Sequence, residues 1–254
     1  MRLHLSKRDL PWYNSAVANS HSHLAALGAQ SIDTDPLKFI LFDLDGTLYP
    51  GDSGLLKEIG RRIQLWLCER LELTWEQAGA LRRDYFYRYG TTLNGLIAER
   101  TVDADDYLAF VHDIPVEGYL GPNPALASML DALPLRRAVY TNASTEYSRR
   151  VLGVLGITHH FERIISIEDV SLRNKLYRDA YQHALMLLGA QGAECIMVED
   201  AARNLQAAKA LGMTTMLLSQ DGALGPTGAA DQSVDFIIDD VLQVGQLVQN
   251  LMMS

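Results

Sequence analysis

Short apolar runs that end in polar residues recur along this chain and alternate with helical patterns. The first run, Lys38–Phe42, is continuous and rich in β-forming residues, as is typical of a strand buried on both faces of a parallel sheet. Similar runs occur at 137–140, 163–167, 195–198, 214–218 and 235–238. Helical patterns separate several of them, at about 144–155, 175–189 and 202–211. This alternation predicts an α/β fold with an open, doubly wound, Rossmann-like parallel sheet.

The alternation is interrupted after the first strand pattern. Positions 50–120 contain helical patterns, at about 53–71, 75–90 and 103–112, but no strand pattern. In the first of these an apolar residue recurs every four positions, which gives a helix one packing face. The interruption is far longer than the two to six residues usual for a βα loop. We therefore predict a separate all-helical domain at 51–119, inserted into an α/β core domain made of 36–50 and 120–254. Within that core we expect a loop at 219–233.

The charge of the chain limits its partners. Its 254 residues carry a formal net charge of -9. Such a surface on average repels nucleic acid backbones and anionic lipid, so we expect no nucleic acid polymer and no membrane as partner. The sequence also lacks an apolar run of the ~18 residues that span a bilayer. A local cation can still bind a small anion, so a small anionic substrate is compatible with this charge. The oligomeric state is left open.

Cysteine content and the N-terminal segment bear on location. Cys68 and Cys195 each lie in an apolar stretch, which predicts two buried free thiols rather than a disulfide or a zinc site. Free thiols are typical of proteins in a reducing compartment, so we expect this protein to be located in the cytoplasm. Residues 1–35 contain no apolar run resembling that of a secretory signal. We expect them to form a flexible N-terminal extension without a catalytic role, with a weak organelle-targeting segment or an over-called start codon as the alternatives.

Polar residues follow several predicted strands, where ligands of open α/β sheets bind. They are Asp43, Asp45, Thr141, Asn142, Lys175, Glu199 and Asp200. Carboxylates brought together repel one another, and a divalent cation is the usual compensation. Magnesium prefers oxygen ligands and substrate phosphates. Side-chain oxygens of Asp43, Asp200 and Glu199, with the backbone carbonyl of Asp45, are the predicted ligands.

Each of these features has an ordinary structural interpretation when taken alone. An Asp-x-Asp-Gly segment is common in turns. Thr141-Asn142 could cap a helix, and Ser144 could do so equally well. Lys175 could be solvated, and Glu199-Asp200 could be favoured by a helix N-terminus. Their joint placement, each at or just beyond the end of a predicted parallel strand, favours one functional site.

The same residues resemble a known motif set. Asp43-Leu-Asp-Gly-Thr-Leu-Tyr49, Thr141-Asn142, Lys175 and Val198-Glu-Asp200 look like the four motifs of the haloacid dehalogenase-like superfamily over about 38–218. The long interval between Asp43 and Thr141 resembles the branch with an all-helical cap.

A finer resemblance is to the pyrimidine 5′-nucleotidase group. It is carried by Tyr85–Leu96, by Leu48-Tyr49-Pro50 and by Arg149–Gly156. The chain departs from that group at Gly46, where Asn is frequent, at Leu176, where Pro is frequent, and at Tyr147-Ser148, where His-Ala is common. These departures affect the nucleotide assignment more than the phosphatase assignment.

The resemblance implies a magnesium-dependent phosphatase whose partner is a small phosphorylated metabolite. Asp43 would attack phosphorus and form an aspartyl phosphate, and Thr141, Asn142 and Lys175 would bind the phosphoryl oxygens. Asp45 would protonate the leaving alkoxide and then activate water. A halide needs no proton donor, and a phosphate-transferring pump must avoid rapid hydrolysis. Asp45 therefore favours a phosphatase or a phosphomutase.

Substrate choice is expected to depend on the cap. Tyr85, Arg88 and Tyr89 are candidate specificity residues, because a base could stack on an aromatic ring and contact a guanidinium. Aromatic residues at this density also occur as core packing. A pyrimidine nucleoside monophosphate is the leading candidate substrate. The alternatives are a sugar-phosphate phosphatase or mutase, and a binding protein of the same fold that has lost turnover.

Overall fold

The computed structural model describes residues 37–219 and 232–253. The predicted extension at 1–35 and most of the predicted loop at 219–233 therefore lie outside the described residues. Six strands form one sheet in the order β3-β2-β1-β4-β5-β6, and every neighbouring pair is parallel. They are β1 (Phe39–Phe42), β2 (Arg136–Tyr140), β3 (Arg163–Ile165), β4 (Cys195–Glu199), β5 (Thr214–Leu218) and β6 (Phe236–Ile238). The predicted parallel, doubly wound α/β fold is confirmed.

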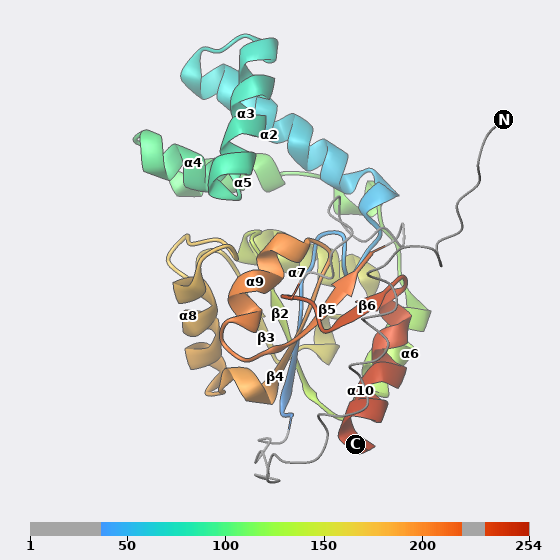
Figure 1. Cartoon of the computed structure of the whole chain (residues 1–254). Coiled ribbons are helices and arrows are strands. Elements are labelled where there is room, and N and C mark those ends of the chain that lie inside the picture. The colour runs from blue at the N-terminus through green and yellow to red at the C-terminus, as the bar shows by residue number, and fades with distance from the viewer. Residues whose placement is uncertain (1–36, 220–231, 254) are drawn as a thin grey trace, which may run out of the picture. The chain divides into compact units, whose positions relative to one another are not determined.

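Alternation along β1 divides the core between two faces of the sheet, because successive side chains of a strand point in opposite directions. Phe39 and Leu41 pack with helices α8 (Arg178–Leu188) and α9 (Ala202–Lys209). Ile40 and Phe42 pack with the helices of the other face. Those are α6 (Pro124–Asp131), α7 (Thr145–Leu155) and α10 (Val244–Met253). Figure 1 shows α8 and α9 on one side of the strands and α6 and α10 on the other.

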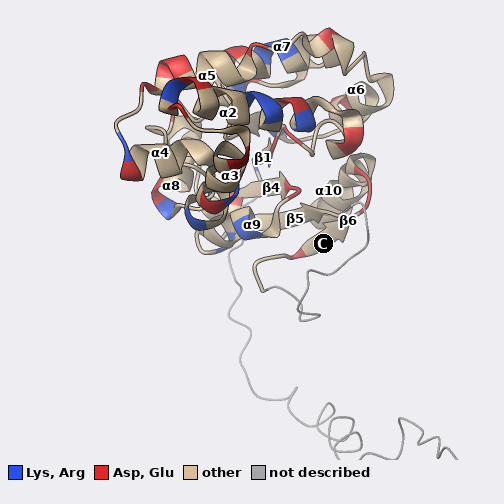
Figure 2. Ribbon diagram, turned by 90° about the horizontal axis from the view of Figure 1, so that it is seen from above, with Lys and Arg blue, Asp and Glu red and all other residues tan. Residues whose placement is uncertain are grey.

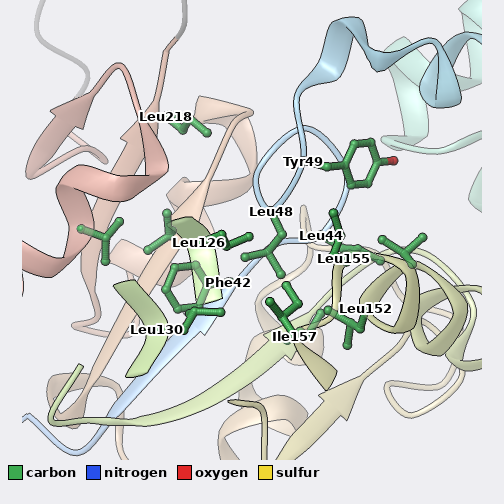
Figure 3. Packing of buried hydrophobic residues seen from close by; sticks show 14 of the residues in the cluster. Phe42, Leu44, Leu48, Tyr49, Leu126, Leu130, Leu152, Leu155, Ile157 and Leu218 are labelled. Atoms are coloured by element: carbon green, nitrogen blue, oxygen red, sulfur yellow. The ribbon is translucent and has the colours of Figure 1, made fainter. Parts of the chain in front are cut away.

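The loop after β1 is anchored in this core. Leu44 and Leu48 are buried, and the backbone N–H of Leu48 donates to the carbonyl of Leu44 at 3.0 Å. Figure 3 shows both side chains among Phe42, Leu152 and other residues of the same cluster. Two apolar anchors that flank the short polar segment between them hold the acidic residues of the loop in place.

Four helices follow the loop and form a separate core. They are α2 (Leu55–Leu71), α3 (Trp75–Tyr89), α4 (Thr92–Glu99) and α5 (Ala104–His112). We call them the cap helices. Their buried residues include Trp66, Tyr85, Leu96 and Leu108. A capping box between Thr74 and Gln77 begins α3. Gly90, with φ of 85°, ends α3, and the Thr91 side chain then caps α4, a short helix that the sequence patterns did not predict.

Other element boundaries differ from the predictions. Helices α6 and α10 were not predicted, and β3 ends two residues early because the Ser166 N–H donates to the Asp169 carboxylate at 2.8 Å. Helix α8 begins at Arg178 rather than near 175, because residues 174–177 form a turn in which the Tyr177 N–H donates to the Asn174 carbonyl at 3.1 Å. Short 3-10 turns lie at Gly51–Ser53, Val116–Gly118, Thr158–His160, Gly192–Glu194 and Val241–Gln243.

Cys195 is buried, Cys68 is partly buried, and both are free, so the expected free thiols are confirmed while the burial of Cys68 is incomplete. Among the described helices, none combines the length and the apolarity that crossing a membrane requires.

Candidate active site

The order of the sheet brings the polar strand ends together. Strand β1 lies between β2 and β4, so Asp43 after β1 has Thr141 after β2 on one side and Glu199 at the end of β4 on the other. Lys175 reaches the same place from the loop between β3 and α8. Residues far apart in the sequence thus meet at one edge of the sheet.

Lys175 lies at the centre of this cluster with 0% of its surface exposed. Its Nζ donates to Asp43 Oδ1 and to Glu199 Oε2, the latter at 2.7 Å. Burial lowers the pKa of Lys175, but the two carboxylates outweigh burial and raise it above its ordinary value. The lysine is therefore a charged, buried group, and the alternative of a solvated side chain does not hold.

Three carboxylates approach one another beside Lys175. One oxygen from each of Asp43, Glu199 and Asp200 lies within 4.8 Å of the others. Burial and the neighbouring Glu199 raise the pKa of Asp43 well above its usual range. The same two causes raise the pKa of Asp200 to about 8. One lysine cannot neutralise these acids together with Asp45, so the group has the charge and the oxygen donors to hold a divalent cation.

The absence of a side chain at Gly46 leaves room for the Asp200 carboxylate. The residue has φ of +87°, and a Cβ at this position would lie 2.3 Å from Asp200 Oδ2. Any larger residue, including the Asn frequent in the pyrimidine 5′-nucleotidase group, would need Asp200 to move and would adopt a strained backbone. The departure at Gly46 is thus matched to the position of Asp200.

Two tyrosines hold the Asp45 carboxylate. The hydroxyls of Tyr49 and Tyr147 both donate to Asp45 Oδ1, at 2.5 and 3.0 Å. Burial raises the pKa of Asp45, and the two hydroxyls partly oppose this by stabilising the carboxylate. Neither tyrosine was predicted as a site residue, although Tyr147 stands where the sequence departs from the His-Ala pattern.

The side chains after β2 mainly organise the backbone. Thr141 Oγ1 accepts a hydrogen bond from the Ala143 N–H at 3.0 Å, and Asn142 Oδ1 accepts one from the Lys175 N–H at 3.1 Å. Ser144 is the N-cap of α7. Asn142 therefore positions Lys175, and the helix-cap role belongs to Ser144.

A cavity of about 360 Å³ lies over these residues. The core lines it with Asp43, Asp45, Thr141, Asn142, Glu199, Asp200 and Arg203, among others. The cap helices and their connections contribute mostly apolar side chains, with Arg82, Thr91, Thr92 and His112 as polar exceptions. The predicted nucleophile and acid thus face a space that the cap partly encloses.

The predicted specificity residues Tyr85, Arg88 and Tyr89 are not among the residues that line this cavity. All three side chains instead contact Glu99 of α4, at 3.0, 2.7 and 2.6 Å respectively. Tyr85 is also buried against Gly95. Arg82 and Phe86, on the same helix, do line the cavity and were not predicted.

The chain belongs to the haloacid dehalogenase-like hydrolase family, whose model matches residues 37–212. The four motifs noted in the sequence lie within this match.

Individual proteins are similar to this chain at sequence identities of 18% to 26%. The chain is 24% identical over 200 residues to Phosphate metabolism protein 8 of Saccharomyces cerevisiae, a match that covers 71% of this chain and only 61% of the yeast protein. It is 26% identical over 230 residues to glyceraldehyde 3-phosphate phosphatase of Methanocaldococcus jannaschii, covering 85% and 98% of the two chains. A HAD phosphatase structure from Thermococcus onnurineus superposes with a TM-score of 0.59 at 18% identity, covering 84% and 98%, and shares the fold.

Proposed function

We propose that this chain is a magnesium-dependent phosphatase that hydrolyses a small phosphate monoester through an aspartyl phosphate on Asp43. The observation that carries the proposal is the pairing of Asp43, which lines the cavity together with Asp45, with the buried Lys175 behind it. Membership of the hydrolase family and the phosphatase among the relatives support the reaction class.

The residues can be given roles. An Asp43 oxygen forms a bond to phosphorus while the bond from phosphorus to the leaving oxygen breaks, and protonated Asp45 gives its proton to that oxygen. Asp45 then takes a proton from a water molecule, which attacks the aspartyl phosphate and releases inorganic phosphate. Lys175 and Thr141, with backbone amides near Asn142, would stabilise the charge on the phosphoryl oxygens.

Magnesium would add charge neutralisation between Asp43 and the phosphoryl oxygens. Side-chain oxygens of Asp43, Asp200 and Glu199, and the backbone carbonyl of Asp45, would hold it. Glu199 already accepts a hydrogen bond from Lys175 at 2.7 Å, so its carboxylate would bind both Lys175 and magnesium.

Asp45 favours phosphatase over dehalogenase, because an alkoxide leaving group needs a proton and a halide does not. Its carboxyl lines the cavity and is held by two hydroxyls. This arrangement supports a proton-transfer role.

The leading substrate candidate is a pyrimidine nucleoside 5′-monophosphate, on the strength of the segment Tyr85–Leu96. A sugar-phosphate phosphatase or mutase is the alternative, and the archaeal relative's name supports a phosphorylated three-carbon substrate. We retain the cytoplasm as the proposed location, in keeping with two free thiols.

Phosphate release from phenyl phosphate, UMP, CMP, purine nucleotides and sugar phosphates, with and without magnesium, tests the proposal. We expect turnover that needs magnesium and is lost in Asp43→Asn, while the exposed Asp52→Asn control keeps it. Chloride release from 2-chloropropionate tests the dehalogenase class. Absence of turnover on every phosphate ester would refute the phosphatase proposal. Equal rates on all of them would refute the pyrimidine assignment alone.

A further inference from the structure

We propose that Arg82 is the cap residue that selects the leaving group, by binding an acceptor oxygen remote from the phosphate. The inference rests on the proposed phosphatase function and specifies its substrate class: phosphate monoesters whose leaving group carries a base carbonyl or a carboxylate.

The first observation is an unused donor set. Arg82 lies on α3, is half-buried and lines the cavity. Its Nε is buried without a hydrogen-bond partner, and its guanidinium forms no hydrogen bond or ion pair with any residue in the described part of the chain. An arginine stays charged at all relevant pH values, and a buried donor without a partner is destabilising. A ligand acceptor in the cavity would remove that penalty.

The other cations near the cavity have their acceptors. Lys175 is bound to two carboxylates. Arg203 donates to the carbonyls of Phe86 and Gly90, at 3.1 and 3.0 Å, and stacks on the Phe86 ring. Arg203 thus joins α9 to the end of α3, whereas Arg82 keeps its donors for the cavity.

The second observation is the space that Gly60 leaves for the guanidinium. Gly60 lies within α2, and a Cβ on it would be 2.9 Å from Arg82 Nη1. Glycine in a helix interior is destabilising relative to alanine. The close approach of the Arg82 guanidinium to the α2 backbone explains why position 60 is a glycine despite this cost.

The third observation is the surrounding surface. Ile59, Ile63 and Leu93 line the same cavity. Apolar neighbours exclude water and strengthen a charged hydrogen bond. Figure 2 shows Lys and Arg together with Asp and Glu on α2 and α3, so the surface of the cap carries both signs of charge. Recognition by Arg82 is therefore local to the cavity rather than a result of the overall field.

The test compares Arg82→Ala with Arg83→Ala, the exposed neighbour on the same helix. The substrates are UMP (a base carbonyl), phosphoglycolate (a carboxylate) and phenyl phosphate, whose leaving group has no remote acceptor. We expect the wild type to prefer at least one acceptor-bearing substrate. Arg82→Ala should lower kcat/KM for that substrate by about 10- to 100-fold, the range of one charged hydrogen bond, and change phenyl phosphate less than twofold. Arg83→Ala should change neither.

A second variant keeps the test independent of folding. Gly60→Ala should stabilise α2 while displacing the guanidinium, and should cause a smaller loss in the same direction on the same substrate. Gly153→Ala is the matched control, because a Cβ at that helical position would meet nothing within 4 Å.

The outcomes separate the two proposals. Loss confined to UMP identifies a carbonyl acceptor, and loss confined to phosphoglycolate identifies a carboxylate. An equal loss on phenyl phosphate, no selective loss, or no preference in the wild type overturns the role of Arg82 while the phosphatase stands. Failure of the wild type on phenyl phosphate and every other ester overturns the phosphatase proposal itself.

Discussion

The Asp45 carboxylate accepts two phenol hydrogen bonds on a single oxygen, and the donating hydroxyls of Tyr49 and Tyr147 are themselves 3.1 Å apart. Two donors on Oδ1 leave Oδ2 as the oxygen available for proton transfer. A general acid must keep a fixed direction toward the leaving oxygen, because proton transfer depends on hydrogen-bond geometry. The tyrosine pair fixes the direction of the Asp45 carboxylate, as the general-acid role proposed for Asp45 requires.

At this scale we expect Tyr147→Phe to lower kcat by roughly tenfold with a small change in KM, because the ring is kept and only a hydrogen bond of ~1–2 kcal/mol is lost. Loss of the hydroxyl should also raise the pKa of Asp45, since that hydroxyl stabilises the carboxylate. Steady-state phosphate release across pH measures both effects. Tyr119→Phe, outside the cavity lining, is the control, and an unchanged kcat in Tyr147→Phe would contradict the positioning role.

The last residue of helix α5, His112, packs against the start of helix α7. His112 is buried, its Nδ1 lies 3.0 Å from Ser144 Oγ, and its ring stacks on Tyr147 at 4.6 Å. Arg150 of α7 also donates to the His112 carbonyl. These contacts join a cap helix to the helix that supplies Tyr147. Burial, and then the nearby Arg150, lower the pKa of His112 to about 3.

A depressed histidine pKa makes stability depend on pH. Between pH 6.5 and about 3 the unfolded chain binds a proton at this residue and the folded chain does not, so stability is lost as pH falls. From pH 7 to pH 5 we expect His112 to remove about 2 kcal/mol from the free energy of unfolding.

Urea denaturation at both pH values, compared with His112→Asn, measures this contribution. Asparagine can keep a hydrogen bond to Ser144 without titrating, so the variant should lose less stability on acidification. Parallel losses in the two proteins would show that His112 is not the titrating group.

On the scale of the whole molecule, the clustered carboxylates oppose folding until a cation neutralises them. Asp43, Glu199 and Asp200 come from β1 and β4, two neighbouring central strands. Asp43 therefore meets the adjacent pair Glu199-Asp200 only in the folded sheet, and its repulsion with that pair is absent from the unfolded chain.

We expect magnesium to raise the melting temperature, because a ligand that binds only the folded state stabilises it. At a concentration of about 100 times Kd the gain is ~2.7 kcal/mol, which corresponds to several degrees for a domain of this size. Asp200→Asn should weaken the magnesium response and raise the melting temperature of the metal-free protein, because the cost of burying the Asp200 carboxylate is removed. Calorimetry with magnesium and with a chelator measures both, and Asp52→Asn is the control. An equal response to magnesium in all three proteins would place the cation elsewhere.

The sequence by itself determined the sheet and the positions of the acids. The spacing of apolar residues and the residues that end each apolar run are local properties of the sequence. The run Lys38–Phe42 and the polar residues after it could therefore be interpreted without a structure. The proximity of Asp43, Lys175 and Asp200 could be predicted because parallel strands all end at one edge of the sheet. Helices α4, α6 and α10 were not predicted, although α9, which is as short as α4 and α6, was.

Only the tertiary structure decided which groups surround those acids. Tyr147 reaches Asp45 across 102 positions, and no local pattern encodes that contact. Helix α3 contains both Tyr85 and Arg82, and the sequence favoured the aromatic residue. In the structure the Tyr85 hydroxyl donates to Glu99 of α4, whereas Arg82 lines the cavity. The position of Asp43 follows from strand order, whereas the positions of Tyr147 and Arg82 depend on how helices from distant segments pack.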